Sequence, residues 1–364
     1  MHCKVRTCRF RTCRFRTVTP LPPRRQRLLQ RRSFRQRPVN QKPGRQRRWL
    51  IPALLASLAL ALWINFAPFT RLTQPLAAAR VARLPTTTPF YSGQRIMVLA
   101  PHPDDETLCC GGLIQQARAA GAEVYLTFMT SGDGFEFDAA LEGRQLRPGP
   151  QAFRDLALKR MNEARAAARV LGVPASHLSF LGYPDGGLLR LFLEHYATPY
   201  LSPTTQLNRV GYDGTLNPGS SYTGLNLERD LAARLDAVRP DLLLVPAPQD
   251  AHPDHRATGY LALRLMAERG QAGRLRFWVV HGGLEWPLPK GVHRTSPLTL
   301  PTRAPDLAWT RADLTPEQVL QKARAIEEYR TQTVLLGRFM QAFERRNELL
   351  STTPLPPGPI LQGH

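Results

Sequence analysis

The hydrophobic and polar positions of the chain alternate in a way that predicts a parallel α/β domain. Five short apolar runs, RIMVLA, VYLTFM, HLSFLGY, DLLLVPA and RFWVV, begin at residues 95, 124, 177, 241 and 276. Continuous apolar runs of this length are typical of strands that are buried on both faces of a sheet. Because helical segments separate the runs, we expect a Rossmann-like three-layer sandwich with a mostly parallel sheet, over residues 94–350.

Two of the segments between these runs carry helix signals. Residues 157–171 keep apolar positions at alternating spacings of four and three, and Gly172 predicts the end of that helix. A second helix is expected to start at Thr315, an N-cap residue followed by proline, because apolar spacing continues over residues 315–340. Residues 186–225 are too long and irregular for a simple connection, so we expect them to form a pocket rim.

The N-terminal residues have a different pattern. Residues 1–48 contain 17 Lys and Arg residues and little aliphatic content, which predicts a disordered basic arm. Residues 49–70 begin with 21 uncharged, mainly apolar residues, 49–69, which would span about 30 Å as a helix. A transmembrane anchor and a cleaved signal peptide are both consistent with this segment, and a buried helix is the third interpretation. Residues 71–93 are predicted to be a linker and residues 351–364 a tail.

The location of the domain follows from this arrangement. In either leading case the basic arm stays inside. The domain that follows is then expected to be membrane-anchored outside the cytoplasm, or exported after signal cleavage. The sequence does not indicate an oligomeric state.

The net charge of +21 suggests a nucleic-acid partner, but its distribution argues against one. From Met1 to Pro103 there are 21 Lys and Arg residues and no Asp or Glu, whereas 28 basic and 28 acidic residues balance from Asp104 onward. A neutral domain lacks the electrostatic footprint of nucleic-acid binding, so no nucleic acid is expected as its partner. Among the five cysteines, the neighbours Cys109 and Cys110 are not expected to bridge, and no spacing indicates a zinc finger or a disulfide framework.

Two short motifs carry the candidate chemistry. PHPDDE starts at Pro101 and QDAHPDH at Gln249, and each follows a predicted strand. Both are therefore expected at the carboxyl edge of the sheet, where α/β proteins bind ligands. Two imidazoles and a carboxylate with an open fourth position are the donor set of a catalytic zinc or iron site. A single HPD motif would favour a loop or a helix cap, but two at equivalent strand ends favour a metal site.

These motifs resemble those of the PIG-L/LmbE family of metal-dependent N-deacetylases, which act on molecules that contain N-acetylglucosamine. The similarity rests on APHPDDETLCCGG and HPDHRAT and covers roughly residues 94–335. RMNEARAAARVLGV is similar to the family's R-x-x-E-A helix and EEYRTQT to its late Tyr-x-x-Gln element, and FLGYPDGGL also supports the resemblance. Cys109 stands where the family often has glycine, and we expect little consequence from this departure.

The resemblance implies that His102, Asp105 and His255 are the metal ligands. Zn²⁺ is the expected ion, with Fe²⁺ or another divalent metal as alternatives. Such an ion lowers the pKa of a water ligand towards about 7 and polarises an amide carbonyl.

The resemblance also implies roles in proton transfer. Asp104 would be the general base, and His252 would stabilise the oxyanion or protonate the leaving amine. Asp254 would orient His252. Arg160 matches the helix arginine of the family and would contact the substrate; the alternative is a pair with Glu163 on a solvated helix face.

Several other polar residues have open assignments. Glu106 is expected to be a first-turn helix residue rather than a ligand. Pocket lining competes with a turn or core role for Asp133, Asp185 and His281. His177, His195 and His293 are expected to be structural or exposed.

The sequence thus predicts an enzyme that removes the acetyl group from an N-acetylated amino sugar in a glycan, glycolipid or glycopeptide, releasing acetate. Two alternatives remain. One is a metal-dependent amidase or esterase of other specificity. The other is a membrane-anchored binding protein that acts through its basic arm.

Overall fold

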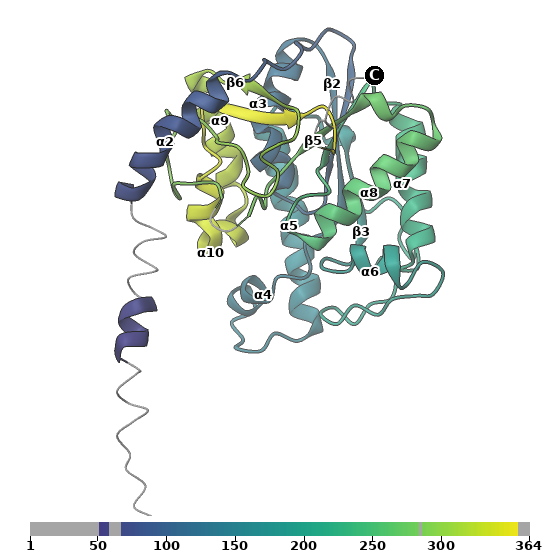
Figure 1. The fold of residues 1–364 in the computed structure, drawn as a ribbon. Helices are drawn as coiled ribbons and strands as arrows, with labels where there is room; N and C mark the ends of the chain where they lie inside the picture. Colours follow the sequence, from purple (N-terminus) through teal and green to yellow (C-terminus); the bar gives the residue numbers. More distant parts are fainter. Residues whose placement is uncertain (1–50, 58–66, 284–285, 356–364) are drawn as a thin grey trace, which may run out of the picture. The chain divides into compact units, whose positions relative to one another are not determined.

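A computed structural model describes residues 51–57, 67–283 and 286–355 (Figure 1). The chain divides into two units, Met1–Leu55 and Ala56–His364. Of the first unit, the structure describes residues 51–55, which are helical. The sheet and the helices that surround it belong to the second unit.

The predicted N-terminal segments fall largely outside these residues. The basic arm, residues 1–48, lies outside the described residues, and so do residues 49–50 and 58–66 of the predicted membrane segment. In the described part of the chain, no helix is both long enough and apolar enough to cross a membrane. Helix α2 (Ala67–Ala82) begins inside the predicted membrane segment and extends into the predicted linker, and its Arg80 forms an ion pair with Asp306.

A seven-stranded sheet with the order β3-β2-β1-β4-β5-β7-β6 forms the centre of the second unit. Its strands are β1 (Arg95–Ala100), β2 (Glu123–Thr130), β3 (Leu178–Tyr183), β4 (Leu242–Pro246), β5 (Leu275–Trp278), β6 (Trp309–Asp313) and β7 (Asn347–Ser351). The first five are the predicted strands and run parallel, whereas β7 lies antiparallel between β5 and β6. The sequences of β6 and β7, WTRAD and NELLS, lack a long apolar run and were not predicted.

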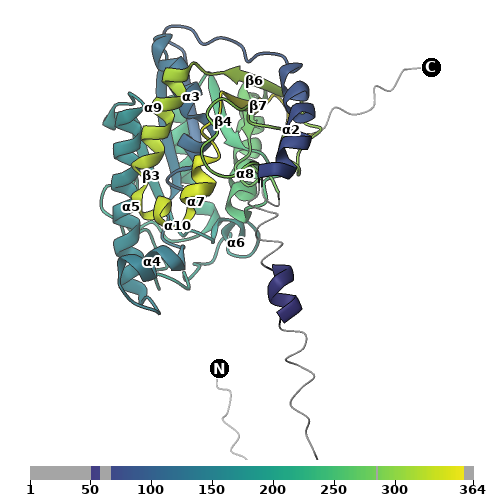
Figure 2. The same cartoon turned by 90° about the vertical axis from the view of Figure 1, so that its left-hand side faces the viewer.

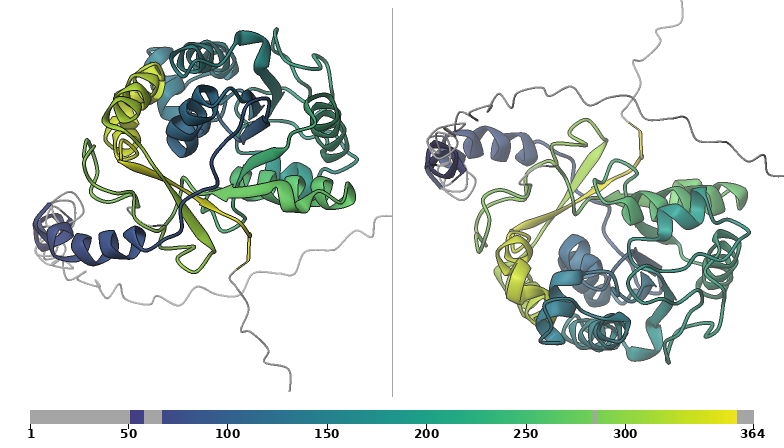
Figure 3. Two further views of the ribbon diagram at one scale, coloured as in Figure 1. Left: turned by 90° about the horizontal axis from the view of Figure 1, so that it is seen from above. Right: turned by 90° about the horizontal axis from the view of Figure 1, so that it is seen from below.

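Helices cover both faces of the sheet (Figures 1 and 2). They are α3 (Asp105–Ala119), α4 (Glu136–Glu142), α5 (Pro150–Val170), α6 (Leu188–Leu193), α7 (Gly224–Val238), α8 (Pro253–Glu268), α9 (Pro316–Glu327) and α10 (Arg330–Gln341), with short 3₁₀ turns at Ala175–His177 and Ala272–Arg274. Helices α3, α5 and α9 pack together on one face, and α6, α7 and α8 pack on the other (Figure 3). The predicted α/β architecture is confirmed.

Strands β1 and β4 are neighbours at the point where the strand order reverses. The chain moves outward from β1 to β2 and β3, and then returns to place β4 on the other side of β1. In doubly wound sheets of this kind, ligands bind beyond the carboxyl ends of the strands at this place. The fold therefore brings the two sequence motifs to one crevice.

The two predicted helices differ in how well their ends were predicted. Gly172, with a φ of +77°, follows the end of α5 as expected. Thr315 caps α9 in a capping box with Gln318, which confirms the predicted start. The predicted continuation to residue 340 is wrong, because the helix is interrupted at Tyr329, between α9 and α10. The Tyr329 side chain is buried and donates a hydrogen bond to Glu106.

A buried ion pair ties α3 to the far end of the chain. The Lys322 ammonium lies 2.7 Å from Glu348 Oε1 and donates to the Leu108 carbonyl at 2.8 Å. Glu348 in turn accepts from the backbone N–H groups of Gly112 and Leu113 at 2.8 Å each. Every charge in this group has a partner, so the helix that carries the first motif is fixed against β7 and α9.

Cys109 and Cys110 lie on α3 and are buried, as expected for a position behind the site. Their sulfur atoms are joined in a disulfide, so the prediction that they do not bridge was wrong. That prediction rested on their being neighbours in the chain; their Cα atoms are 3.8 Å apart, below the usual separation of about 4.4–6.8 Å in disulfides.

Candidate metal centre

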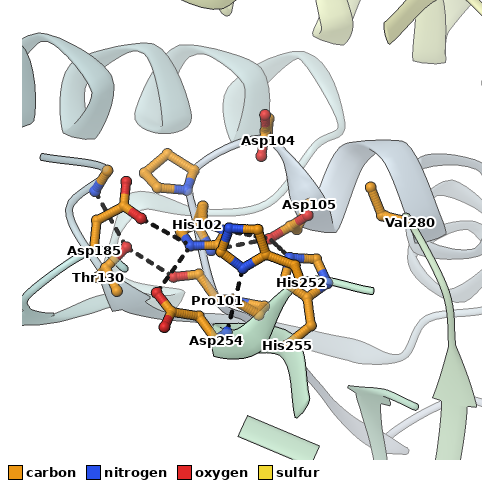
Figure 4. Close-up of polar contacts among 12 residues, drawn as sticks. Pro101, His102, Asp104, Asp105, Thr130, Asp185, His252, Asp254, His255 and Val280 are labelled. Carbon is orange, nitrogen blue, oxygen red and sulfur yellow. Dashed lines mark hydrogen bonds and ion pairs between the residues drawn. The ribbon is translucent and has the colours of Figure 1, made fainter. Parts of the chain in front are cut away.

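The two motifs meet at the carboxyl ends of β1 and β4. His102 lies in the loop after β1, and Asp105 starts α3 directly behind it. His255 lies in the first turn of α8, which follows β4 after a short loop. The side chains of His102, Asp105 and His255 lie side by side in Figure 4, and all three are buried. Residues about 150 positions apart in the sequence are thus in contact.

One oxygen of Asp105 is the common point of the three predicted ligands. Asp105 Oδ2 lies 3.2 Å from His102 Nδ1 and 3.1 Å from His255 Nε2. The same oxygen accepts the backbone N–H of His102 at 3.0 Å. Neither ring nitrogen of His255 makes a hydrogen bond of normal geometry, although both are fully buried. For Nε2, which faces Asp105, a bound ion would supply the missing partner.

The two contacts of Asp105 Oδ2 fit the edges of a tetrahedral ion site. An ion with ligands at about 2.0–2.1 Å separates neighbouring ligand atoms by about 3.3 Å, close to the two contacts of Asp105 Oδ2. Further donors lie in the same place, since three overlapping groups have ligand atoms within 4.8 Å of one another. These groups are His102, His252 and His255; Asp105, His255 and His281; and His102, Asp185 and Asp254. Imidazole and carboxylate donors of this kind suit zinc and other divalent transition metals.

Carboxylates contact the second ring nitrogen of both histidines in the predicted ligand set. His102 Nε2 lies 3.1 Å from Asp185 Oδ1 and 3.3 Å from Asp254 Oδ2. His255 Nδ1 lies 3.2 Å from Asp250 Oδ2. Such partners fix the orientation of a ligand histidine and leave its other nitrogen directed at the ion. This supporting layer is therefore complete for both histidines.

The supporting carboxylates are themselves held by backbone N–H groups. Asp250 accepts from Val280 at 2.9 Å and from His281 at 3.0 Å. Asp254 accepts from Gly186 at 2.7 Å and from Leu188 at 3.0 Å. Both carboxylates are fully buried, so these hydrogen bonds offset the cost of removing their charges from water.

The buried carboxylates control the charge of both histidines. Burial opposes protonation of His102, but the charge of Asp185 and hydrogen bonds to the surrounding carboxylates raise its pKa well above the ordinary value. Burial likewise opposes protonation of His255, but Asp105 and Asp250 outweigh it and raise its pKa to about 10. The carboxylates thus stabilise an added proton on each imidazole. A metal cation bound at the same place would displace that proton.

Asp104 precedes Asp105 in the chain, and its carboxylate contacts residues other than the three predicted ligands. It forms the N-cap of α3 with a φ of 131°, and its carboxylate accepts a hydrogen bond from the Gln332 side-chain amide. Its Oδ2 also lies 4.0 Å from the Arg160 guanidinium. Burial and the neighbouring charge of Asp105 raise the pKa of Asp104 well above its ordinary value. A carboxyl group in this position is suited to accept a proton and to return it.

His252 lines the same cavity but has a different partner from the predicted one. The Asp254 carboxylate contacts His102 and backbone N–H groups, not the His252 ring. His252 Nδ1 instead accepts the backbone N–H of Asp254 at 3.2 Å, because His252 is the N-cap of α8. Asp254 thus supports a predicted ligand, whereas a helix cap orients His252. Burial and the positive charges of His102 and other nearby histidines lower the pKa of His252 to about 2.

Arg160 is buried on α5 and points into the cavity, only 4% exposed. It donates to the Gly132 carbonyl at 2.9 Å and to the Pro103 carbonyl at 3.2 Å. The alternative of a solvated pair with Glu163 is wrong, because Glu163 accepts hydrogen bonds from Thr331 instead. Arg160 therefore ties α5 to the loop that carries the first motif.

The remaining candidates divide between the cavity and its surroundings. Asp185 and His281 line the cavity, whereas Asp133 accepts from the Tyr212 hydroxyl and from the backbone of Asp185. Glu106 lies in the first turn of α3, as expected, and burial raises its pKa to about 7. His177, His195 and His293 do not line the cavity.

The cavity itself has a volume of about 310 Å³. Its lining combines polar side chains, among them Arg160 and Asp185, with the apolar side chains of Phe135, Leu336 and Phe339. Of the segment 186–225, predicted to form the rim, only Gly186 lines it.

Two site residues were missed from the sequence. Asp250, which supports His255, lies inside the quoted QDAHPDH motif, five residues before the ligand. Gln332, which binds Asp104, is the glutamine of the quoted Tyr-x-x-Gln element, to which no role was assigned.

Comparisons with known proteins agree with this geometry. Residues 97–266 match the model of a family described as PIG-L: GlcNAc-PI de-N-acetylase. A diacetylchitobiose deacetylase from Thermococcus kodakarensis is 24% identical over 185 residues, which cover 50% of this chain and 52% of the relative. A 1D-myo-inositol 2-acetamido-2-deoxy-alpha-D-glucopyranoside deacetylase from Nakamurella multipartita is 30% identical over 174 residues, covering 46% and 53%. The chain spans about half the length of these curated relatives.

Solved structures are more distant. A deacetylase of the teicoplanin biosynthetic pathway is 22% identical, with a TM-score of 0.44, over 69% of this chain and 88% of the other. A similarity of this size carries no argument about activity.

Proposed function

We propose that the chain hydrolyses the N-acetyl group of an amino-sugar substrate and releases acetate, because residues 97–266 match the model of the PIG-L family. The observation that carries the proposal is the contact of Asp105 Oδ2 with both His102 and His255, with Asp104 beside it. The two curated relatives described above are named as deacetylases of amino-sugar compounds, which supports this substrate class. The substrate would be a glycan, a glycolipid or a glycopeptide.

His102, Asp105 and His255 would hold a divalent ion, for which Zn²⁺ fits the donor set and Fe²⁺ or another divalent metal is the alternative. When bound, the ion would polarise the amide carbonyl and make a water molecule acidic enough to attack it near neutral pH. The buried carboxylates behind both histidines keep their ring orientation during this process.

Asp104 would move the proton. Its carboxylate would accept the proton of the attacking water and then deliver it to the departing amine nitrogen. The raised pKa of Asp104 suits both steps, because a carboxyl group with an ordinary pKa would hold the proton too weakly to return it. The Gln332 amide fixes the carboxylate while leaving it free of the ligand set.

His252 would donate a hydrogen bond to the carbonyl oxygen. Since its Nδ1 accepts the backbone N–H of Asp254, the neutral ring carries its hydrogen on Nε2. The lowered pKa keeps the ring neutral at physiological pH. Of the two predicted roles, oxyanion stabilisation is therefore favoured over protonation of the leaving amine.

The polar side chains that line the cavity would bind the sugar. Arg160 and Asp185 lie 3.8 Å apart, and together they offer donors and acceptors to neighbouring hydroxyl groups. We also propose that the domain acts outside the cytoplasm, either anchored or exported. The support for this location is the uncharged sequence of residues 49–69 behind a basic arm.

The function is tested with the purified full chain and two soluble substrates. N,N'-diacetylchitobiose should release acetate in the presence of Zn²⁺, and a chelator should abolish the release. The variant His255→Ala should lose both bound zinc and activity, whereas the matched surface variant Leu225→Ala should keep both. Hydrolysis of p-nitrophenyl acetate without any release from the acetylated sugar would favour an esterase instead.

A further inference from the structure

Five large apolar side chains are exposed on α4, on the loop that follows it and on α10. They are Phe137, Leu141, Leu146, Val334 and Leu335, with exposed fractions of 70%, 48%, 101%, 65% and 48%. We call these five residues the apolar lip. Single exposed apolar residues are common on protein surfaces, but a group on adjacent elements marks a surface that another body covers.

The apolar lip is continuous with apolar residues that line the cavity. The rings of Phe137 and Phe135 are 6.0 Å apart in an edge-to-face arrangement, and Phe135 lines the cavity. On α10, Leu335 of the lip precedes Leu336, which also lines the cavity. Helices α4 and α10 contact each other directly (Figure 1). The lip therefore lies at the mouth of the site and not on an unrelated surface.

Basic side chains are interspersed with the lip. Arg144 and Arg147 are exposed on either side of Leu146, and Arg338 is exposed on α10. Of the exposed acidic residues on α4, Glu142 is paired with Lys159, which leaves Glu136. Apolar side chains surrounded by arginines are the composition that binds the interface of an anionic membrane.

We propose that the apolar lip inserts into the surface of a lipid bilayer that carries anionic headgroups. The cavity mouth would then face the bilayer, and the substrate would be an amino sugar attached to a membrane lipid. The uncharged segment 49–69 of the same chain is a second feature that favours a membrane. Membrane contact by the lip stands on these observations, whereas the nature of the substrate also rests on the proposed deacetylase function.

Contact with the bilayer is tested without reference to catalysis. The full chain is reconstituted with vesicles of phosphatidylcholine and phosphatidylglycerol in a 7:3 ratio, with bromine atoms on the acyl chains as fluorescence quenchers. An added tryptophan in Phe137→Trp should be quenched, and one in the control Leu225→Trp, on a 54% exposed residue of α7, should not. Equal quenching at the two positions would overturn the proposal, even with an active enzyme.

The role of the lip in catalysis needs a matched pair of variants. Leu146→Asp should lower hydrolysis of a diacyl lipid-linked N-acetylglucosamine in these vesicles about tenfold, because burying a leucine contributes about that factor to partitioning. Hydrolysis of N,N'-diacetylchitobiose should be unchanged, and Leu225→Asp should change neither. Equal activity of Leu146→Asp and the parent on the vesicles would contradict the proposal. Sedimentation that showed a dimer for the parent and a monomer for Leu146→Asp would contradict it too, because a second copy of the chain would then cover the lip.

The two proposals fail in different ways. A parent chain that releases no acetate from either substrate but shows quenching at position 137 would overturn the deacetylase function and leave the membrane contact supported. A parent that hydrolyses chitobiose but shows no quenching contrast would overturn only the membrane contact.

Discussion

The side-chain amide of Gln332 donates a hydrogen bond to the carboxylate of Asp104. The same amide donates to the Pro103 carbonyl at 3.0 Å, so it holds both the side chain and the backbone of the motif. Asp104 has a φ of 131°, a conformation that residues other than glycine rarely adopt and that costs about 1–3 kcal/mol. Surrounding contacts must therefore maintain it, and Gln332 on α10 is one of them.

Replacing Gln332 by alanine should lower kcat about 10- to 100-fold, because a small displacement of a general base has an effect of this size. The zinc content of Gln332→Ala should equal that of the parent, since Gln332 contacts none of the three predicted ligands. Steady-state kinetics with N,N'-diacetylchitobiose and metal analysis of the same samples measure both quantities. Loss of zinc in this variant would assign Gln332 to the ion site and not to Asp104.

Asp104 and Asp105 should respond in opposite ways although they are neighbours in the chain. Asp104→Asn should keep bound zinc and lose turnover by about 10²- to 10⁴-fold, the usual contribution of a general base. Asp105→Ala should lose the zinc itself, because its Oδ2 is the common contact of both histidines. Full turnover in Asp104→Asn would remove the assigned base.

Asp250 should affect metal affinity without touching the metal. Asp250→Asn weakens the carboxylate contact with His255 Nδ1, and changes of this kind typically reduce metal affinity about 10- to 100-fold. Competition with a chromogenic chelator measures the zinc dissociation constant. Asp236→Asn, at an exposed carboxylate on α7, is the matched control and should leave the constant unchanged.

Metal affinity should depend on pH in a defined direction. The pKa of His255 is raised to about 10 in the protein without metal, so zinc must displace a proton from it at any lower pH. The apparent dissociation constant should therefore rise at least tenfold for each unit that the pH falls from 8 to 6. Calorimetry in buffers of different ionisation enthalpy should show proton release on binding, and a dissociation constant independent of pH would contradict the account.

The sequence predicts the catalytic edge of the fold well because its signals are local. Each of the five parallel strands is a short apolar run, and each motif directly follows one of them. Only β6 and β7 were missed, since their partners rather than their own hydrophobicity determine that they are strands. The break at Tyr329 was missed for a similar reason, because a long-range hydrogen bond to Glu106 overrides a helical pattern.

The supporting residues of the site could not be assigned from the sequence. Asp250 and Asp254 are both acids in the same short motif; Asp254 was predicted to orient His252, and Asp250 was assigned no role. Their functions depend on which histidine each one meets across the fold: His255 for Asp250 and His102 for Asp254. Such contacts depend on the geometry of the loop between β4 and α8, which no local pattern specifies.

The central claim is that two distant loops hold one divalent ion next to an unligated aspartate. Crystallographic anomalous scattering at the zinc edge, on the zinc-loaded full chain, tests it most directly. The account predicts one strong peak within about 2.0–2.2 Å of His102 Nδ1, Asp105 Oδ2 and His255 Nε2. A peak coordinated by Asp104, or one elsewhere in the chain with none between His102 and His255, would contradict it.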